Sequence, residues 1–204
     1  INGGVRSKPQ TIPVMDAEQH RLLVSDILKD HPDYDAARLD KMKFFNDNPT
    51  FLYYKQNHNN TAWKDFVYRD AVSQSYSLAA TGGDEVGMYA IFVNYRNNQG
   101  LVRNTSMQQI STRFNSDIVL RDNISISTKF ALSNQSYDLK NDGIISPTSP
   151  SGLSYIKAPA LYPYSYAKMT GIISTLFEDY DELGVNNPEA ILKKSQQINT
   201  QNSF

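Results

Sequence analysis

Ser154 and Lys157 come closest in type and spacing to a known catalytic pattern. They match the serine-x-x-lysine motif of penicillin-recognising enzymes, in which the serine is the nucleophile. The companion motifs of those enzymes, serine-aspartate-asparagine and lysine-threonine-glycine, are missing from this sequence. A four-residue pattern of this kind also arises by chance. Because no set of nucleophile, base and orienting group can be assembled, we expect that the chain is not an enzyme.

The histidines, cysteines and glycines indicate no cofactor site. The histidines are His20, His31 and His58, none at a metal-ligand spacing from another, and we interpret each as a solvated loop or helix residue. The chain has 0 cysteines, which excludes thiolate ligands and a cysteine nucleophile. Gly82 and Gly83 are followed by no Gly-Lys-Ser/Thr, so we interpret them as a hairpin turn and not as a phosphate loop.

The acidic residues offer one cluster, formed by Asp33, Asp35 and Asp40. It lacks the central glycine and the terminal glutamate of a calcium-binding loop, so we interpret it as a solvated acidic loop. The sequence therefore predicts no catalytic residue, no metal site and no cofactor.

A cluster of tyrosines is the candidate site that remains: Tyr155, Tyr162, Tyr164 and Tyr166. Flat aromatic rings on an outer loop can stack on sugar rings or contact a partner protein. The alternative is local packing of a long loop among its prolines. An alanine substitution of Tyr162 and Tyr164 distinguishes these two interpretations.

Length and composition restrict the class of protein to which the chain can belong. A chain of 204 residues suits one domain or a large piece of one. The formal net charge of -1 argues against a broad basic surface, so we expect no nucleic-acid partner. Charged residues are only 20% of the chain and aromatic residues are 11%, which fits neither a disordered polyampholyte nor a helical bundle.

Apolar residues recur with a period of two from about residue 70. The alternating segments are 72–81, 86–96, 110–120 and 124–134, and turn residues separate them. By the hairpin rules, this pattern predicts an all-β fold with a four-strand antiparallel meander over residues 70–135. The charged residues within these segments should all lie on the polar face: Arg96, Arg113, Asp117 and Lys129.

The flanking segments predict long loops that carry short helices. Residues 14–30 should form a helix with Asp16 as N-cap and Gln19 as its capping-box partner, and its apolar face should hold Leu23, Val24, Ile27 and Leu28. Residues 31–62 have the composition of a polar loop, with a short helix around Leu39–Phe45. Residues 136–200 should form one long extracellular loop, in which Asn187 caps a short helix over Pro188–Gln197.

The alternating strands fit two environments. A soluble β-sandwich buries one face of each strand and shows the same period. Strands of about 10 residues, alternating short and long loops, and tyrosines that bracket apolar residues favour a transmembrane β-barrel. The bracketing tyrosines are Tyr89 and Tyr95, around Ile91 and Val93. No apolar run reaches the roughly 18 residues of a membrane-spanning helix, but barrel strands escape that criterion.

One long stretch resembles a known family. Its residues are Asn60-Thr61-Ala62-Trp63-Lys64-Asp65, Val67-Tyr68-Arg69-Asp70-Ala71, Ser73-Gln74-Ser75-Tyr76-Ser77-Leu78, Gly82-Gly83-Asp84-Glu85, Tyr89, Asn94-Tyr95, Gln99-Gly100-Leu101-Val102 and Arg113-Phe114-Asn115. This stretch resembles the early barrel of TonB-dependent outer-membrane transporters of the SusC/RagA type, found in Bacteroidota. The flanks resemble the family's loops at Met15-Asp16-Ala17-Glu18-Gln19, Ile156-Lys157-Ala158-Pro159 and Asn187-Pro188-Glu189-Ala190-Ile191-Leu192. The family commonly has acidic residues where this chain has Ala62 and Gln99.

The resemblance implies a fragment of a larger importer in the outer membrane of a Gram-negative cell. The family's signal peptide, TonB-contacting segment and plug domain would lie before Ile1, and further barrel strands after Phe204. The implied partners are a SusD-like lipoprotein, the TonB complex, outer-membrane lipid, and a glycan or peptide substrate. The alternative is a soluble or surface-anchored β-sandwich binding module, such as an adhesin or a glycan-binding domain.

Overall fold

The computed structural model describes residues 1–10, 12–51, 53–141, 148–164, 187–189, 192 and 197–203. The chain divides into two compact units. The first, here called the sheet unit, comprises Ile1–Pro9, Arg69–Lys140 and Gln196–Phe204. The second, called the loop unit, comprises Gln10–Tyr68 and Asn141–Ser195. Within the described residues, no helix is both long enough and apolar enough to cross a membrane.

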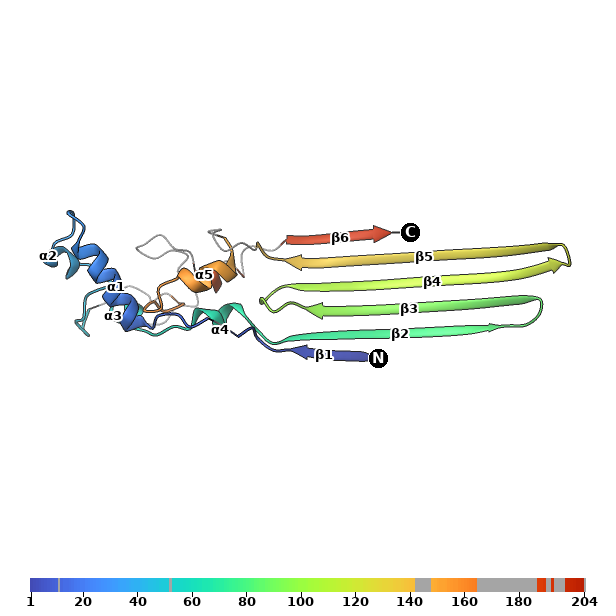
Figure 1. Cartoon of the computed structure of the whole chain (residues 1–204), viewed down its shortest axis with the longest axis horizontal. Helices are drawn as coiled ribbons and strands as arrows, with labels where there is room; N and C mark the ends of the chain where they lie inside the picture. The colour runs from blue at the N-terminus through green and yellow to red at the C-terminus, as the bar shows by residue number, and fades with distance from the viewer. Residues whose placement is uncertain are drawn as a thin grey trace. The chain divides into compact units, whose positions relative to one another are not determined.

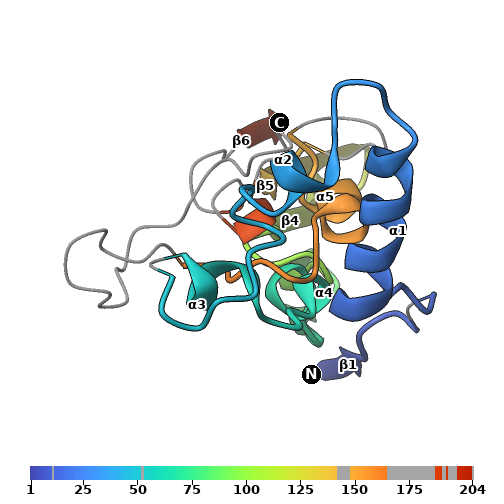
Figure 2. The ribbon, with the colours of Figure 1, turned by 90° about the vertical axis from the view of Figure 1, so that its left-hand side faces the viewer.

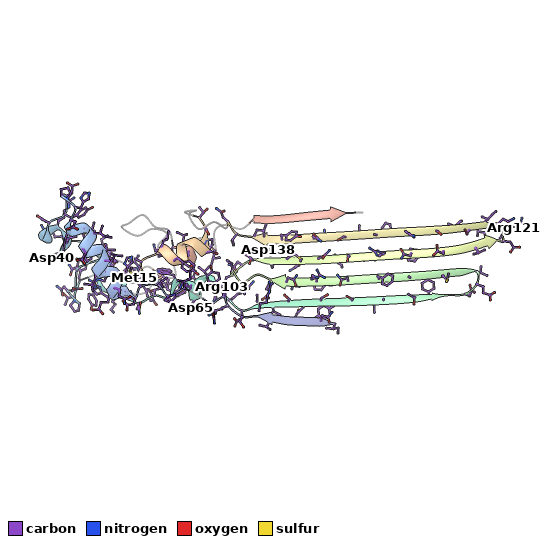
Figure 3. All side chains as sticks on the ribbon, viewed as in Figure 1. Met15, Asp40, Asp65, Arg103, Arg121 and Asp138 are labelled. Carbon is purple, nitrogen blue, oxygen red and sulfur yellow. The ribbon has the colours of Figure 1, made fainter. Side chains whose placement is uncertain are left out.

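The sheet unit is one antiparallel sheet of six strands that follow one another in sequence order (Figure 1). The strands are β1 (Asn2–Arg6), β2 (Ala71–Gly83), β3 (Gly87–Gln99), β4 (Ser106–Arg121), β5 (Ile124–Leu139) and β6 (Gln197–Ser203). Strands β2 to β5 confirm the predicted four-strand meander. They are longer than predicted, because polar residues at their ends continue the backbone pairing past the apolar stretches. Figure 3 labels Arg121 at one end of the long strands and Asp138 at the other.

The strand register aligns the predicted apolar faces with one another. Tyr95 pairs with Tyr76 on one side and with Ile110 on the other, and Phe114 pairs with both Ile91 and Phe130. Directly paired residues of neighbouring strands lie on the same face of a sheet. The apolar faces of β2 to β5 therefore form one continuous surface, as the period predicted.

The β2–β3 turn depends on Gly83 and Asp84. Gly83 has a φ of 143°, a backbone conformation that L side chains rarely adopt, and a Cβ there would overlap the backbone of Gly87. The Asp84 carboxylate accepts hydrogen bonds from the backbone N–H groups of Val86 (2.9 Å) and Gly87 (3.0 Å). The hydrogen bond from Gly87 N–H, and to a smaller extent the one from Val86 N–H, lowers the pKa of Asp84.

Arg69 holds the β3–β4 loop at the other end of the sheet. Its guanidinium donates to the carbonyl oxygens of Gly100 (3.2 Å) and Thr105 (3.0 Å), and its backbone N–H donates to Leu101 O (2.9 Å). Asp70, the next residue, accepts a hydrogen bond from the backbone N–H of Lys8 (2.8 Å). The start of β2 therefore ties together the loop on one side and the segment after β1 on the other.

The loop unit contains the helices α1 (Ala17–Lys29), α2 (Ala36–Leu39), α3 (Tyr54–Asn57), α4 (Trp63–Val67) and α5 (Pro150–Ile156) (Figure 2). Its apolar core comprises Phe44, Trp63, Ala158, Ala160 and Leu161, with Ala17, Val24 and Phe45 packed against it. The core thus joins residues up to the start of α4 to residues after α5. These two parts of the chain are separated in sequence by most of the sheet.

Helix α1 has the predicted N-cap, and its apolar residues are buried to different extents. Asp16 and Gln19 form the capping box, with Gln19 N–H donating to Asp16 Oδ1 at 2.8 Å. Val24 packs against the core, whereas Leu23 and Ile27 are 42% and 60% exposed. Only part of the predicted apolar face therefore packs against the core.

Residues 31–62 contain turns and short helices, and several of their side chains are buried. Leu39 and Phe44 are buried, and Gln56 and Asn57 of α3 are buried as well. The expected helix around Leu39–Phe45 ends at Leu39, as the last residue of α2, and turns follow it. The amide side chains at 56 and 57 are buried because backbone carbonyls accept their hydrogen bonds: Gln56 donates to Tyr162 O and Asn57 to Tyr53 O.

Candidate functional site

The sheet unit exposes a continuous apolar face, defined here by Tyr76, Leu78, Tyr89, Ile91, Val93, Tyr95, Ile110, Phe114, Ile118, Ile126, Phe130 and Leu132. Leu78 is 70% exposed, Phe130 is 53% exposed and Ile110 is 49% exposed. Single exposed apolar residues are ordinary, but a contiguous apolar patch of this extent marks an interaction surface. This face requires either a protein layer or an apolar solvent against it.

Aromatic residues stand near both ends of the apolar face. The Tyr76 and Tyr95 rings stack with centroids 6.2 Å apart, as directly paired residues of β2 and β3. Nearer the β2–β3 turn, the Tyr89 ring lies over Gly82, where a Cβ would come within 2.6 Å of its hydroxyl. Tyrosines at two heights with aliphatic residues between them match the aromatic girdles of membrane barrels.

The opposite face of the same strands is mostly polar, although Met88 and Phe92 also lie on it. Ser77 Oγ donates to Asn94 Oδ1 across β2 and β3 at 2.9 Å. A hollow of about 370 Å³ lies among β3, β4 and β5 on this face, and Asn94, Ser111, Arg113 and Ser133 are among its lining residues. The register places all four charged residues predicted for this face on it, namely Arg96, Arg113, Asp117 and Lys129. The sheet therefore has one apolar face and one mostly polar face.

The loop unit contains the tyrosines singled out from the sequence. Tyr162 and Tyr164 lie together, with ring centroids 5.7 Å apart, and Pro163 between them is buried. Partial burial, and to a smaller extent the nearby Glu189 carboxylate, raises the pKa of Tyr164. Tyr166 lies outside the described residues.

Backbone hydrogen bonds between two loop segments position the Tyr162–Tyr164 pair. Tyr162 N–H donates to Gln56 O (2.9 Å), Asn59 N–H to Ala160 O (2.9 Å) and Thr61 N–H to Pro159 O (2.7 Å). The Trp63 indole N–H extends this ladder by donating to Ala158 O at 2.9 Å. This ladder fixes the backbone that carries Tyr162. It gives each of these backbone N–H and C=O groups a hydrogen-bond partner, and a buried backbone group without a partner would be unfavourable.

Asn187 makes hydrogen bonds beside the Tyr162–Tyr164 pair. Its side-chain amide donates to Pro163 O at 2.9 Å, and its carbonyl oxygen accepts from Glu189 N–H at 2.9 Å. The second bond is the cap predicted for Asn187, and Pro188, Glu189 and Leu192 are helical. The rest of the predicted helix over Pro188–Gln197 lies outside the described residues up to the start of β6.

Tyr155 makes different ring contacts from Tyr162 and Tyr164. It lines a groove of about 830 Å³ that is bounded by residues 12–16, α1, residues 60–64 and α5. Lys64 Nζ lies 4.7 Å from the centroid of the Tyr155 ring, a cation–π arrangement. Burial, with Tyr68 beside it, raises the pKa of Tyr155. The structure therefore distributes the predicted tyrosine cluster over at least two different settings.

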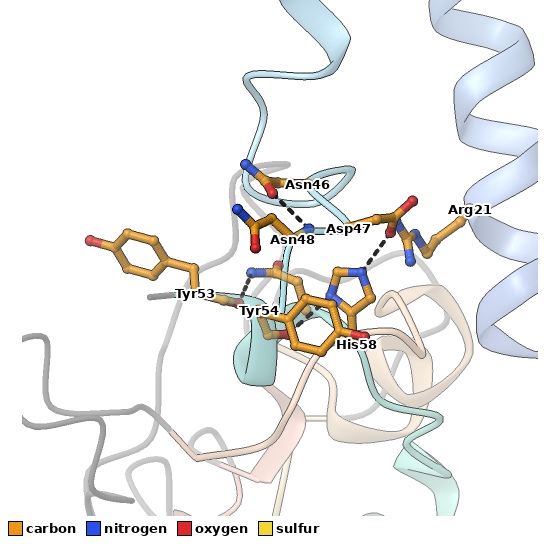
Figure 4. Close-up of polar contacts among 8 residues, drawn as sticks. Arg21, Asn46, Asp47, Asn48, Tyr53, Tyr54 and His58 are labelled. Atoms are coloured by element: carbon orange, nitrogen blue, oxygen red, sulfur yellow. Dashed lines mark hydrogen bonds and ion pairs between the residues drawn. The ribbon is translucent and has the colours of Figure 1, made fainter. Parts of the chain in front are cut away.

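A charged network that the sequence did not suggest joins Arg21, Asp47 and His58 (Figure 4). The Asp47 carboxylate lies 2.6 Å from an Arg21 guanidinium nitrogen and 2.8 Å from His58 Nε2. His58 Nδ1 lies 3.0 Å from Tyr54 O, and its ring stacks on the Tyr54 ring at 3.9 Å. The His58 side chain is only 12% exposed, so the prediction of a solvated histidine is wrong for this residue.

The catalytic pattern noted in the sequence has a structural use. The Ser154 hydroxyl donates to Ser151 O at 2.7 Å, within α5, and Lys157 Nζ lies 6.0 Å from the Trp63 ring centroid. Both residues are buried. Among the described residues, no group of three or more histidines, cysteines or carboxylates is arranged to hold a metal ion.

Comparisons with known proteins find a likeness in fold alone. No protein-family model matches the sequence, and no curated protein matches it. The chain is similar to the solved structure of the RagAB peptide importer in the "closed-closed" state, with a TM-score of 0.62 and 11% sequence identity. It is also similar to a structure of the RagAB peptide transporter, with a TM-score of 0.53 and 14% identity. Each match covers 92% of this chain and 23% of the other, so the chain spans about a quarter of those proteins' length.

Proposed function

We propose that the chain is part of an outer-membrane, TonB-dependent importer of the SusC/RagA type, in which β2 to β5 form a piece of the barrel wall. The observation that carries the proposal is the continuous apolar face opposite a polar face that holds the charged residues. A lipid-facing barrel wall needs this distribution, because a Lys or Arg on the lipid side near mid-membrane costs about 2–4 kcal/mol. The fold similarity to RagAB importers supports the same function.

The dimensions of the strands support a membrane setting. β4 and β5 are 16 residues long, more than the roughly 9–11 residues that a tilted strand needs to cross a bilayer. On β4 the apolar positions run from Ile110 to Leu120, which is ~34 Å along the strand at about 3.4 Å per residue. A tilt of about 40° reduces this to ~26 Å of membrane depth, close to the ~25 Å apolar band of outer-membrane barrels.

In the proposed importer, the remainder of the protein supplies the plug and the segment that contacts the TonB complex. A SusD-like lipoprotein is the proposed partner at the outer face, and glycans or other large nutrients are the proposed substrates. The loop unit, with its half-buried Tyr162 and Tyr164 and its exposed Tyr155, is then the part of this chain that faces the cell exterior. The likeness to peptide importers supports nutrient uptake in general.

The test is an uptake and fractionation experiment on the whole protein in its own cell. We expect it in the outer-membrane fraction, and we expect growth on its nutrient to be lost when TonB is removed. Recovery in the soluble fraction, with growth independent of TonB, would instead indicate a β-sandwich binding module.

The tyrosines provide a finer test of the same proposal. Replacing Tyr162 and Tyr164 with alanine in the whole protein should weaken uptake or binding of the lipoprotein, if these rings contact substrate or partner. A matched control is Tyr34→Ala, in the same unit but in the segment after α1. If uptake and partner binding are both unchanged in the double variant, the rings serve only to pack the loop.

A further inference from the structure

The groove beside α1 combines an exposed apolar lining with fixed positive charge. Ile12, Val14, Met15 and Leu23 line it from the N-terminal side and are 72%, 52%, 48% and 42% exposed. Ile156 lines it from α5 and is 56% exposed. These residues belong to one hollow, so their exposed surface is contiguous, unlike the scattered apolar residues of an ordinary surface.

Two lysines place their ammonium groups among the aromatic rings of this groove. Lys64 Nζ lies over Tyr155 and donates to the carbonyl oxygen of Ile12. Lys157 is 5% exposed, and its Nζ lies 6.0 Å from the Trp63 ring centroid. A ring face and a carbonyl oxygen orient an ammonium group without neutralising it. Lys64 therefore presents a full positive charge at an apolar surface.

Among the described residues that line the groove, the two lysines outnumber the acidic groups. Asp16 is the carboxylate that lines it, and this side chain accepts the α1 capping bond from Gln19 N–H at 2.8 Å. His20, the other titratable group on α1 that lines the groove, can add only positive charge. The complementary ligand is consequently apolar and anionic at once.

We propose that this groove docks an extended segment of a partner protein in which Asp or Glu stands next to a large apolar side chain. The apolar side chain fills the space between Leu23 and Ile156, and the carboxylate pairs with Lys64. A charge-assisted hydrogen bond of this kind is short and directional, and it is stronger at a partly desolvated site than in open water. The inference rests on the groove alone and does not depend on the importer function.

Trp63 provides a direct reporter for the test. It is the single tryptophan of the chain and it lines the groove. The full chain, held in a zwitterionic detergent, is titrated with three blocked tetrapeptides: acetyl-Glu-Leu-Glu-Leu-amide, its Lys-Leu-Lys-Leu counterpart and its Ser-Leu-Ser-Leu counterpart. The expected result is a saturable change in Trp63 emission with the acidic peptide and none with the other two.

Two variants and a salt titration make the test specific. Lys64→Gln should weaken binding of the acidic peptide about tenfold, Ile156→Ser should weaken it as well, and Lys41→Gln, at an exposed lysine outside the groove, should leave it unchanged. Raising the salt concentration should weaken binding to the unaltered chain, which tests the charge pairing without any substitution.

Three results would overturn the proposal. One is an equal response to all three peptides, which indicates that the groove binds apolar groups without regard to charge. Another is a response to the acidic peptide that neither salt nor Lys64→Gln reduces. The third is a Trp63 emission that changes with protein concentration in the absence of peptide, which indicates that a second copy of the chain occupies the groove.

Discussion

At the scale of single residues, the His58 ring lies between two hydrogen-bond acceptors. The two acceptors are the backbone carbonyl oxygen of Tyr54 and the carboxylate of Asp47. Asp47 is therefore the centre of this network, since the Arg21 guanidinium and the His58 ring contact the same carboxylate.

This network predicts a loss of stability in acid. The hydrogen bond from His58, followed by that from Arg21, lowers the pKa of Asp47 from its ordinary value of 3.8. Because the folded value is the lower one, the stabilisation is complete above about pH 4 and is lost as the pH falls through the folded value. Asp47 is 76% exposed, so solvent screening limits the effect to about 1 kcal/mol or less.

Urea unfolding of the loop unit, followed by Trp63 emission at pH 3 and pH 6, measures this effect. We expect the stability difference between the two pH values to shrink in Asp47→Asn and to persist in Asp40→Asn, at an exposed aspartate. An unchanged pH dependence in Asp47→Asn would show that the network does not stabilise the fold.

Gly83 is a residue-scale requirement of the β2–β3 hairpin. Its φ of 143° and the closeness of the Gly87 backbone leave no room for a Cβ, so we expect Gly83→Ala to cost about 1–3 kcal/mol. The matched control is Gly87→Ala, where a Cβ would meet its nearest neighbours at 3.7 and 3.8 Å, an ordinary contact. Thermal unfolding monitored by circular dichroism compares the two. Equal loss of stability in both variants would remove the conformational explanation.

At the scale of elements, the sequence predicted the strands whose side chains alternate and missed those formed by pairing alone. β2 to β5 carry a two-residue apolar period, which fixes both their existence and the face that each residue occupies. β1 contains Gly3 and Gly4 and has no such period, and β6 is almost entirely polar. These two strands follow from pairing with β2 and β5, a tertiary effect that local sequence does not encode.

The candidate sites likewise divide into those that local sequence predicted and those that only the folded chain brings together. The tyrosines at 162 and 164 were predictable as a pair, because two residues separated by a single proline lie near each other. The network of Arg21, Asp47 and His58 was not, since its members come from α1, a turn and the end of α3, and only the folded loop unit brings them together. The groove was hidden for a related reason: its lining combines four separate stretches of sequence.

The two faces of β3 lead to an element-scale prediction. Ile91 lies on the apolar face between the tyrosines at 89 and 95, and Asn94 lies on the polar face. If the apolar face contacts lipid, Ile91→Arg should destabilise the assembled barrel by about 2–4 kcal/mol, whereas Asn94→Arg should be tolerated. The amount of heat-modifiable, folded protein in the outer membrane measures both. Comparable losses in the two variants would contradict a lipid-facing surface.

At the scale of the whole molecule, the role of the sheet depends on which solvent covers its apolar face. The sheet is open in the described chain, with β1 and β6 at its edges, and its two faces differ in chemistry along four strands. Lipid on one side and a polar lumen on the other accommodate this difference without a second sheet. The loop unit adds the surfaces that would meet partners or substrate.

The most direct test is the accessibility of neighbouring positions on β3 in the intact protein in lipid vesicles. Single cysteines carrying a nitroxide spin label replace Ile91, Phe92, Val93 and Asn94 in turn, and the described chain has 0 cysteines of its own to interfere. Collisions with oxygen, which concentrates in lipid, should dominate at 91 and 93, and collisions with a water-soluble nickel chelate should dominate at 92 and 94. Equal access of the nickel chelate to all four positions would contradict a membrane-facing sheet and would place the apolar face in water or under protein.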